Sequence, residues 1–225
     1  MHILHCSDFH ANEGWFGWLA DHASDYDLVC LTGDQLDLFS LYRLGDQLSM
    51  VKGALGRITT PLALCSGNHD SIGGGRVVDP RLFQAKWLKE IGRAGTWIDG
   101  DKFNLSGQNF RCVGWNALLP AATADEIWLY HAPPARSGAA VGIDGNDAGD
   151  EILGEMCRAE NGPALVLSGH QHNPQRWACR VGRSWCLNPG YKQHAKTPSH
   201  IVIDTEALTA VFHTGGRSPT TIQIL

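Results

Sequence analysis

Short apolar runs alternate with polar clusters along this chain. Five of the runs predict buried strands, because they are rich in aliphatic residues and are bounded by Gly or Pro. They are Ile3–Leu4, Leu28–Leu31, Leu62–Cys65, Ile127–Tyr130 and Ala164–Leu167. The pattern thus predicts a fold built around buried strands.

Helical periodicity fills the segments between several of these runs. Leucine and valine recur at three- and four-residue spacing over residues 41–55, which predicts one helix. Asp79-Pro80 is typical of a helix start and predicts a second helix to about Ile91, and a third is expected from about Asp147 to Ala159. The strand–helix alternation implies parallel pairing and layered α/β packing.

The pattern changes after Gly169. Four short runs with turn residues between them predict an antiparallel meander that completes a second sheet. They are residues 184–187, 200–203, 209–213 and 221–224. Trp15 and Trp18 fall at helical spacing, so we expect core packing rather than stacking on a nucleobase.

Potential metal ligands follow each of the five strand-like runs directly. The clusters are Asp8-Phe9-His10, Gly33-Asp34, Gly67-Asn68-His69-Asp70, His131 and Gly169-His170-Gln171-His172. Sites in open α/β sheets form outside the carboxyl ends of the strands, so these side chains are expected to converge. Oxygen and imidazole ligands suit divalent metals, and there are enough of them for two ions. The clusters therefore predict a two-metal hydrolase.

Composition limits the architecture. With 225 residues and 43% hydrophobic residues, the chain can bury one sizeable core, and we expect a single domain spanning residues 1–225. No apolar stretch is long enough to span a membrane, and the first residues lack the features of a signal peptide. Most of the seven cysteines lie in strand-like runs and none forms a C-x-x-C pair, which favours buried thiols and a reducing, cytoplasmic setting.

The net charge of −5 leaves no basic footprint for nucleic acid, which is therefore disfavoured as a partner but not excluded. The predicted site has its own electrostatics. Two carboxylates, neutral ligands and two divalent cations would leave it at about +2, because the ions are the largest local charges. We expect the site to attract anions in an acidic protein.

These motifs, in this order, carry a family resemblance. D-x-H, G-D, G-N-H-D, a lone His and G-H-x-H resemble the calcineurin-like metallophosphoesterase superfamily, from Asp8 to about Gly190. The resemblance implies a four-layer αββα sandwich of two mixed β-sheets flanked by helices. The His131-Ala132-Pro133-Pro134 block is similar to that of the small single-domain bacterial and archaeal phosphoesterases.

The resemblance also implies the ligand sets. One ion would take Asp8, His10, Asp34 and His172, and the other would take Asp34, Asn68, His131 and His170. Asp34 would bridge the two divalent ions, whose identity stays open among Mn, Fe, Zn, Ni, Co and Mg. Among these ions, manganese is the one that we expect. His69 is interpreted as a non-ligand general acid, whose ring Asp70 would hold and keep protonated.

The resulting hypothesis is a dinuclear phosphoesterase that acts on a small phosphate ester by in-line attack of a metal-bridging hydroxide. Phosphodiesters, such as cyclic nucleotides or small diesters, are favoured, since Ser66 stands where the related protein phosphatases carry an arginine. A phosphomonoesterase, a nuclease on short nucleic acids and a non-catalytic scaffold remain alternatives. Several cations could clamp a phosphate, although each is also typical of a solvated surface: Arg76, Arg136, Arg176 and Lys192. The substrate-binding residues and the oligomeric state remain open.

Overall fold

Two β-sheets face each other in the computed structural model, which describes residues 1–71 and 84–224. The first sheet has the order β13-β12-β11-β1-β2-β3-β4 and the second β5-β6-β7-β8-β10-β9. The strands of the first are β1 His2–Cys6, β2 Leu28–Thr32, β3 Leu62–Cys65, β4 Thr96–Trp97, β11 His200–Asp204, β12 Thr209–His213 and β13 Thr220–Gln223. Those of the second are β5 Lys102–Leu105, β6 Gln108–Val113, β7 Glu126–Tyr130, β8 Leu165–Leu167, β9 Ala178–Val181 and β10 Ser184–Leu187.

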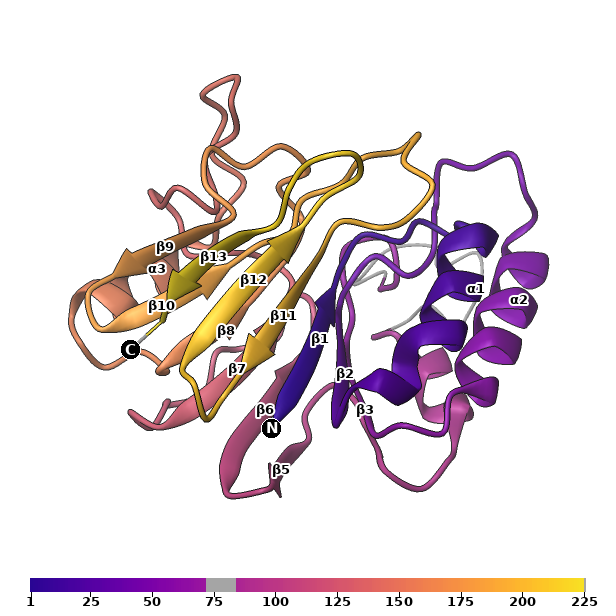
Figure 1. Ribbon diagram of the computed structural model, residues 1–225, viewed down its shortest axis with the longest axis horizontal. Helices are drawn as coiled ribbons and strands as arrows, with labels where there is room; N and C mark the ends of the chain where they lie inside the picture. The colour runs from indigo at the N-terminus through magenta and orange to yellow at the C-terminus, as the bar shows by residue number, and fades with distance from the viewer. Residues whose placement is uncertain (72–83, 225) are drawn as a thin grey trace.

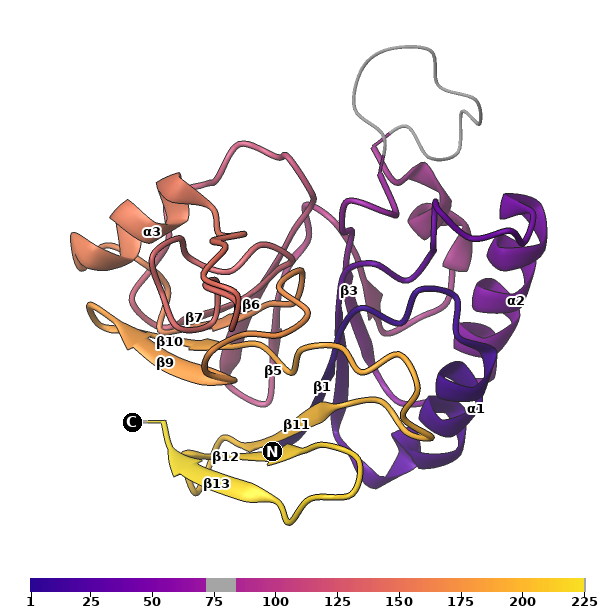
Figure 2. The same cartoon turned by 90° about the horizontal axis from the view of Figure 1, so that it is seen from above.

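Helices cover the outer faces of both sheets (Figures 1 and 2). Helices α1 (Glu13–His22) and α2 (Leu44–Arg57) lie outside β1–β3, and α3 (Glu151–Arg158) lies beyond the second sheet. Two 3₁₀ helices, η1 (Ala23–Asp25) and η2 (Lys86–Ile91), connect elements on the α1/α2 side. The layers therefore follow the order αββα, as expected.

The strands are apolar on both faces because both faces are covered. In β2, Leu28 and Cys30 enter the core between the sheets, while Val29 and Leu31 pack under α1 and α2. A third apolar cluster joins α3 to the second sheet through Leu153. This alternation explains why the sequence shows continuous apolar runs.

The five predicted strands are present, and the parallel pairing is confirmed for β1-β2-β3 and β6-β7-β8. The placement of the meander was wrong. β11, β12 and β13 extend the first sheet, because β11 pairs antiparallel with the edge of β1 that β2 leaves open. Only the 184–187 run joins the second sheet, as β10 parallel to β8.

The helix predictions needed adjustment. Helix α2 buries Leu48, Val51 and Leu55 as expected, but it begins at Leu44, so the predicted stripe residue Leu41 lies outside the helix and is exposed. Helix α3 begins only at Glu151, because the Asp150 side chain caps it by accepting from Leu153 N–H. The predicted start at Asp79-Pro80 lies outside the described residues, and the described part of that segment contains the 3₁₀ helix η2.

The tryptophan prediction holds for Trp15, which is buried and whose Nε1 atom donates to the Ala195 carbonyl. All seven cysteines are free thiols, six of them buried. Within residues 1–71 and 84–224, no helix has both the length and the apolar character needed to cross a membrane.

Candidate metal centre

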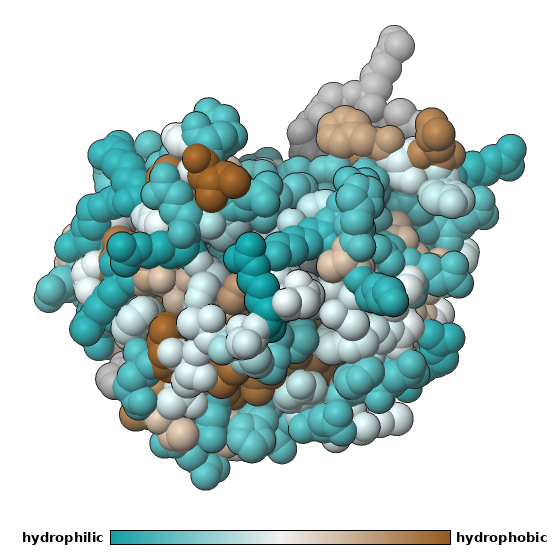
Figure 3. All heavy atoms as spheres, turned by 45° about the horizontal axis from the view of Figure 1, so that its top comes forward, coloured by the Kyte–Doolittle hydropathy of each residue, from teal (hydrophilic) through white to brown (hydrophobic). Residues whose placement is uncertain are grey.

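The predicted ligands follow the carboxyl ends of strands from both sheets. Asp8 and His10 come after β1, Asp34 after β2, Asn68 after β3, His131 after β7, and His170 and His172 after β8. Because β1–β3 run parallel, as do β7 and β8, their ends meet at one edge of the sandwich. Figure 3, which turns the upper side of Figure 1 forward, shows a largely hydrophilic surface with separate hydrophobic groups.

One group consists of Asp8, His10, Asp34 and His172, each offering a ligand atom within 4.8 Å of the other three. The Nε2 atoms of His10 and His172 lie only 3.1 Å apart, and His172 Nε2 lies 3.5 Å from Asp8 Oδ1. His10 Nε2 is 3.9 Å from Asp34 Oδ2. Two imidazoles and two carboxylates that face one point form a donor set that fits a divalent metal.

A second group contains Asp34, His131 and His170, again within 4.8 Å. Asn68 joins it, since its Oδ1 lies 3.2 Å from His131 Nε2, which is itself 3.3 Å from Asp34 Oδ2. Asp34 is therefore common to both groups. The two sets that the sequence predicted are brought together in space, and their role as ligands stays a prediction.

His131 shows how the surroundings prepare a ligand. Its Nδ1 atom lies 2.6 Å from the Thr32 carbonyl oxygen, to which Nδ1–H donates. In the neutral ring this leaves the lone pair of Nε2 directed toward Asp34 and Asn68. The backbone carbonyl thus selects the tautomer that a metal requires.

Unusual backbone conformations place several of these side chains. Asp8, His10, Asp34 and His170 all have positive φ, between 45° and 66°. Non-glycine residues in this region carry strain and concentrate at functional sites. Hydrogen bonds hold the turns, for example from Asp8 N–H to the Gly33 carbonyl and from His10 N–H to the Asp34 carbonyl.

Two glycines permit the close approach of the strand ends. A Cβ atom on Gly33 would lie 2.3 Å from His131 Nδ1, and one on Gly67 would lie 2.2 Å from Asp34 Oδ1. These contacts are far shorter than any van der Waals distance. The glycine before Asp34 and the glycine before Asn68 are therefore needed for packing as well as for the turns.

Electrostatics reinforce the geometry. Burial by itself would raise the pKa of Asp8, yet its hydrogen bond with His172 and the nearby charged histidines hold that pKa below its usual value. Burial opposes the charge on His131 too, but the Asp34 and Asp8 carboxylates raise the pKa of His131 to about 9. Two buried carboxylates thus draw positive charge into the site, which is what divalent cations would supply.

The environment of His69 differs from the sequence-based expectation. Its Nδ1 atom accepts from Leu38 N–H at 3.1 Å and lies 3.4 Å from Asp37 Oδ1, while its Nε2 is 4.0 Å from Asp34 Oδ2. His10, Asp37 and His69 form a further set within 4.8 Å. The ring therefore adjoins the metal groups, with Asp37 as its acidic neighbour.

The side chain of Asp70 binds backbone N–H groups instead of the His69 ring. Its carboxylate accepts N–H groups from Gln35, Leu36 and Gly67, at 2.9 to 3.2 Å. Among the described residues, none of its hydrogen bonds or ion pairs reaches the ring of His69, so the prediction that Asp70 holds that ring is wrong. The reason is that the chain turns at Asn68-His69 and directs Asp70 inward, toward the backbone after β2.

Two aromatic residues at the site were not predicted from the sequence. Tyr191 packs its ring 5.0 Å from that of His10 and 4.7 Å from that of His172. Trp115 packs its ring 5.0 Å from that of His170. Neither carries a motif signal, although Tyr191 directly follows the Asn188-Pro189-Gly190 turn, whose Asn188 side chain donates to the Gly169 and Gln171 carbonyls.

The predicted phosphate clamps separate in space. Arg136 is exposed and paired with Glu151 at 2.8 Å, which makes it a surface ion pair. Arg176 and Lys192 line a cavity beside His172. Arg76 lies outside the described residues.

The fold and the site define a phosphoric ester hydrolase of the metallophosphoesterase class. Residues 1–208 match the family described as the calcineurin-like phosphoesterase superfamily domain, and the chain belongs to this family. None of the curated proteins compared with it matches.

Solved structures share the fold. An archaeal protein described as a novel phosphodiesterase is 18% identical, with 99% of both chains covered and a TM-score of 0.54. A Thermus thermophilus protein is 15% identical, covering 100% of this chain and 99% of its own, with a TM-score of 0.58. A purple acid phosphatase from yellow lupin seeds is 11% identical, covering 99% of this chain and 53% of its own, with a TM-score of 0.61.

Proposed function

We propose that this chain is a dinuclear metal-dependent phosphoesterase that favours small phosphodiesters. The observation that carries the proposal is the position of Asp34, whose Oδ2 atom lies 3.3 Å from His131 Nε2 in one group and 3.9 Å from His10 Nε2 in the other. A shared carboxylate offsets the repulsion between two cations roughly 3.5–4 Å apart. Residues 1–225 would work as one domain, since both sheets supply ligands.

Two divalent cations held there would polarise the phosphate oxygens and supply a water-derived nucleophile at neutral pH. The protein contributes the positions of the ligands and the exclusion of water around Asp8, Asp34 and His131, which are almost completely buried. The metal identity remains open among Mn, Fe, Zn, Ni, Co and Mg, because such sites follow metal availability.

His69 is the proposed proton donor to the leaving oxygen. A ring nitrogen that accepts a hydrogen bond carries no proton, so with Nδ1 bonded to Leu38 N–H the neutral ring keeps its proton on Nε2. Nε2 is the atom that faces Asp34. In the charged ring, Nδ1–H has Asp37 Oδ1 within reach as an acceptor. The His69 ring would therefore carry a proton on Nε2 in both its neutral and its charged form.

The test is metal analysis of reconstituted protein together with hydrolysis of bis(p-nitrophenyl) phosphate. We expect about two ions per chain, and loss of both ions and of activity in Asp34→Ala. Asp21→Ala, which removes an exposed carboxylate from α1, is the matched control and should change neither. A stoichiometry near zero with every metal tried would overturn the proposal and favour the scaffold alternative.

A further inference from the structure

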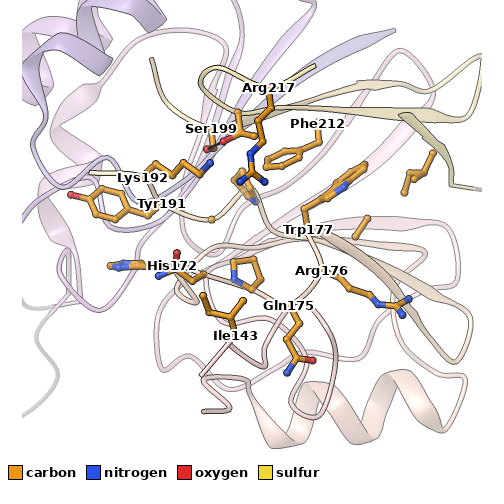
Figure 4. Close-up of a pocket in the computed structure, with 17 residues that line it drawn as sticks. Ile143, His172, Gln175, Arg176, Trp177, Tyr191, Lys192, Ser199, Phe212 and Arg217 are labelled. Carbon is orange, nitrogen blue, oxygen red and sulfur yellow. Dashed lines mark hydrogen bonds between the residues drawn. The ribbon is translucent and has the colours of Figure 1, made fainter. Parts of the chain in front are cut away.

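A cavity of about 590 Å³ opens beside the metal groups, next to His172. Its lining comes from the segment after β8, from residues 189–192, and from β12, β13 and the turn between them (Figure 4). The cavity therefore lies where the two sheets meet at the site. A molecule bound at His172 would extend into it.

The charged side chains that the described residues contribute to this cavity all have one sign. Arg176, Lys192 and Arg217 line it, and none of the described lining residues carries a carboxylate side chain. Figure 4 shows the Lys192 ammonium and the Arg217 guanidinium turned toward the same space, while Arg176 extends to the other side. Within the described part of the chain, no ion pair neutralises Lys192 or Arg217. Two unpaired cations thus face an open space beside the site of a protein with a net charge of −5.

The opposite side of the site has the opposite charge. A second cavity, of about 560 Å³, lies next to His10. It is lined by Glu13, Asp37 and Asp46, and the described part of its lining contains no lysine or arginine. Tyr191 lines both cavities. An anionic substituent is therefore attracted to the His172 side and repelled from the His10 side.

Aromatic side chains complete the basic cavity. The rings of Trp177 and Phe212 stack with centroids 5.3 Å apart and planes 18° apart, one beside β9 and one on β12. The Arg217 side chain runs beside Phe212 in Figure 4. The stack joins a residue beside β9 of the second sheet to a residue of β12 in the first sheet, and it gives the cavity an apolar wall.

We propose that this basic cavity binds a second phosphate group of the substrate. The preferred substrates are then phosphodiesters that carry a terminal phosphomonoester, such as 5′-phosphorylated dinucleotides. Arg217 suits the oxygens of a terminal phosphate because its guanidinium can donate two parallel hydrogen bonds, and Lys192 adds a point charge. The inference rests on the proposed function, since it specifies the substrate of the same site.

The experiment compares two dinucleotides with the same scissile bond, pApA and ApA, which differ only in the 5′-phosphate. The wild-type protein is expected to have a higher kcat/KM for pApA. Arg217→Ala and Lys192→Ala should each lower kcat/KM for pApA about 10-fold, as the loss of one charge-assisted hydrogen bond predicts, and leave ApA unchanged. Arg180→Ala removes an exposed arginine of β9 that does not line the cavity and should keep the wild-type ratio.

A binding measurement separates this cavity from the metals. Calorimetric titration of metal-free protein with adenosine 5′-monophosphate should show binding that weakens in Arg217→Ala and Lys192→Ala, with melting temperatures unchanged. If ApA is hydrolysed but pApA is not preferred, or if the variants keep the preference, the basic cavity is not a phosphate subsite. If no diester is hydrolysed with any metal, the proposed function fails, and equal nucleotide affinity in wild type and variants then overturns the subsite as well.

Discussion

His69 Nδ1 lies 3.4 Å from Asp37 Oδ1. Asp37 precedes His69 by 32 positions and follows a different strand. The ring therefore takes its acidic partner from the loop after β2 rather than from Asp70, its neighbour in sequence. Substitutions of Asp37 and of Asp70 should therefore have different effects.

Asp37→Asn should keep both metals and lower the rate by about 10-fold, a part of the 10²–10⁴-fold that general acid catalysis contributes. The reason is that the amide removes the carboxylate charge that lies 3.4 Å from His69 Nδ1. Asp70→Asn should instead destabilise the fold by about 2 kcal/mol, because its amide group replaces an acceptor of buried N–H groups. Thermal melting and metal analysis of both variants check this. A large loss of stability in Asp37→Asn, with none in Asp70→Asn, would reverse the assignment.

The second prediction concerns the role of His69 itself. If His69 protonates the leaving oxygen, His69→Asn should retain metal and lose about 10²–10⁴-fold in rate on ApA, whose leaving alkoxide is strongly basic. Nitrophenolate departs without help, so bis(p-nitrophenyl) phosphate should be affected less. His22→Asn, on the exposed end of α1, is the control. Equal losses on both esters would assign His69 to stabilising the phosphoryl group, and loss of metal would make it a ligand.

Gly67→Ala should disrupt the metal centre. The added methyl group would meet Asp34 Oδ1 at 2.2 Å, and both Asp34 and the neighbouring Asn68 would have to move. We expect fewer than two ions per chain by metal analysis, and loss of activity. Gly56→Ala is the matched control, since a methyl group there meets no atom within 4 Å and alanine favours helix α2. Full metal content in Gly67→Ala would contradict the packing argument.

Diesters should be preferred over monoesters. Ser66 precedes the Gly67-Asn68 turn, but its hydroxyl is buried, donates to Asp99 Oδ2 at 2.6 Å and accepts from Trp115 N–H. It therefore offers no charge to a phosphomonoester dianion. The measurement is kcat/KM for bis(p-nitrophenyl) phosphate and p-nitrophenyl phosphate with one metal, and a higher value for the monoester would show this prediction to be wrong.

Glu126 at the start of β7 should make stability depend on pH. Burial would raise its pKa, but hydrogen bonds from Arg111, Lys102 and Trp128 lower it from 4.5 to about 2. The carboxylate thus contributes stability above pH 4.5, which is lost as the pH falls toward 2. Glu126→Gln should lower the melting temperature at pH 7, with a difference from wild type that shrinks below pH 4.5. Glu155→Gln, an exposed control on α3, should show no difference at either pH.

Local sequence determined most of the strands and the composition of the site. Apolar runs such as Leu28–Leu31 predict strands because burial on both faces requires apolar side chains at every position. The ligand types directly after these runs predict a metal centre, because the carboxyl ends of parallel strands share one edge. Both inferences depend only on residues close in sequence.

Tertiary structure decided the rest. The strands of the meander extend the first sheet because β11 pairs with the free edge of β1. Which strand pairs with a free edge depends on the path of the whole chain. Asp37 rather than Asp70 met His69 because the direction of each side chain depends on how separate turns pack. Lys192 follows β10 of the second sheet and Arg217 lies between β12 and β13 of the first, so only the packing of the sheets brings both to the cavity beside His172. Such encounters join residues far apart in sequence, so no local pattern encodes them.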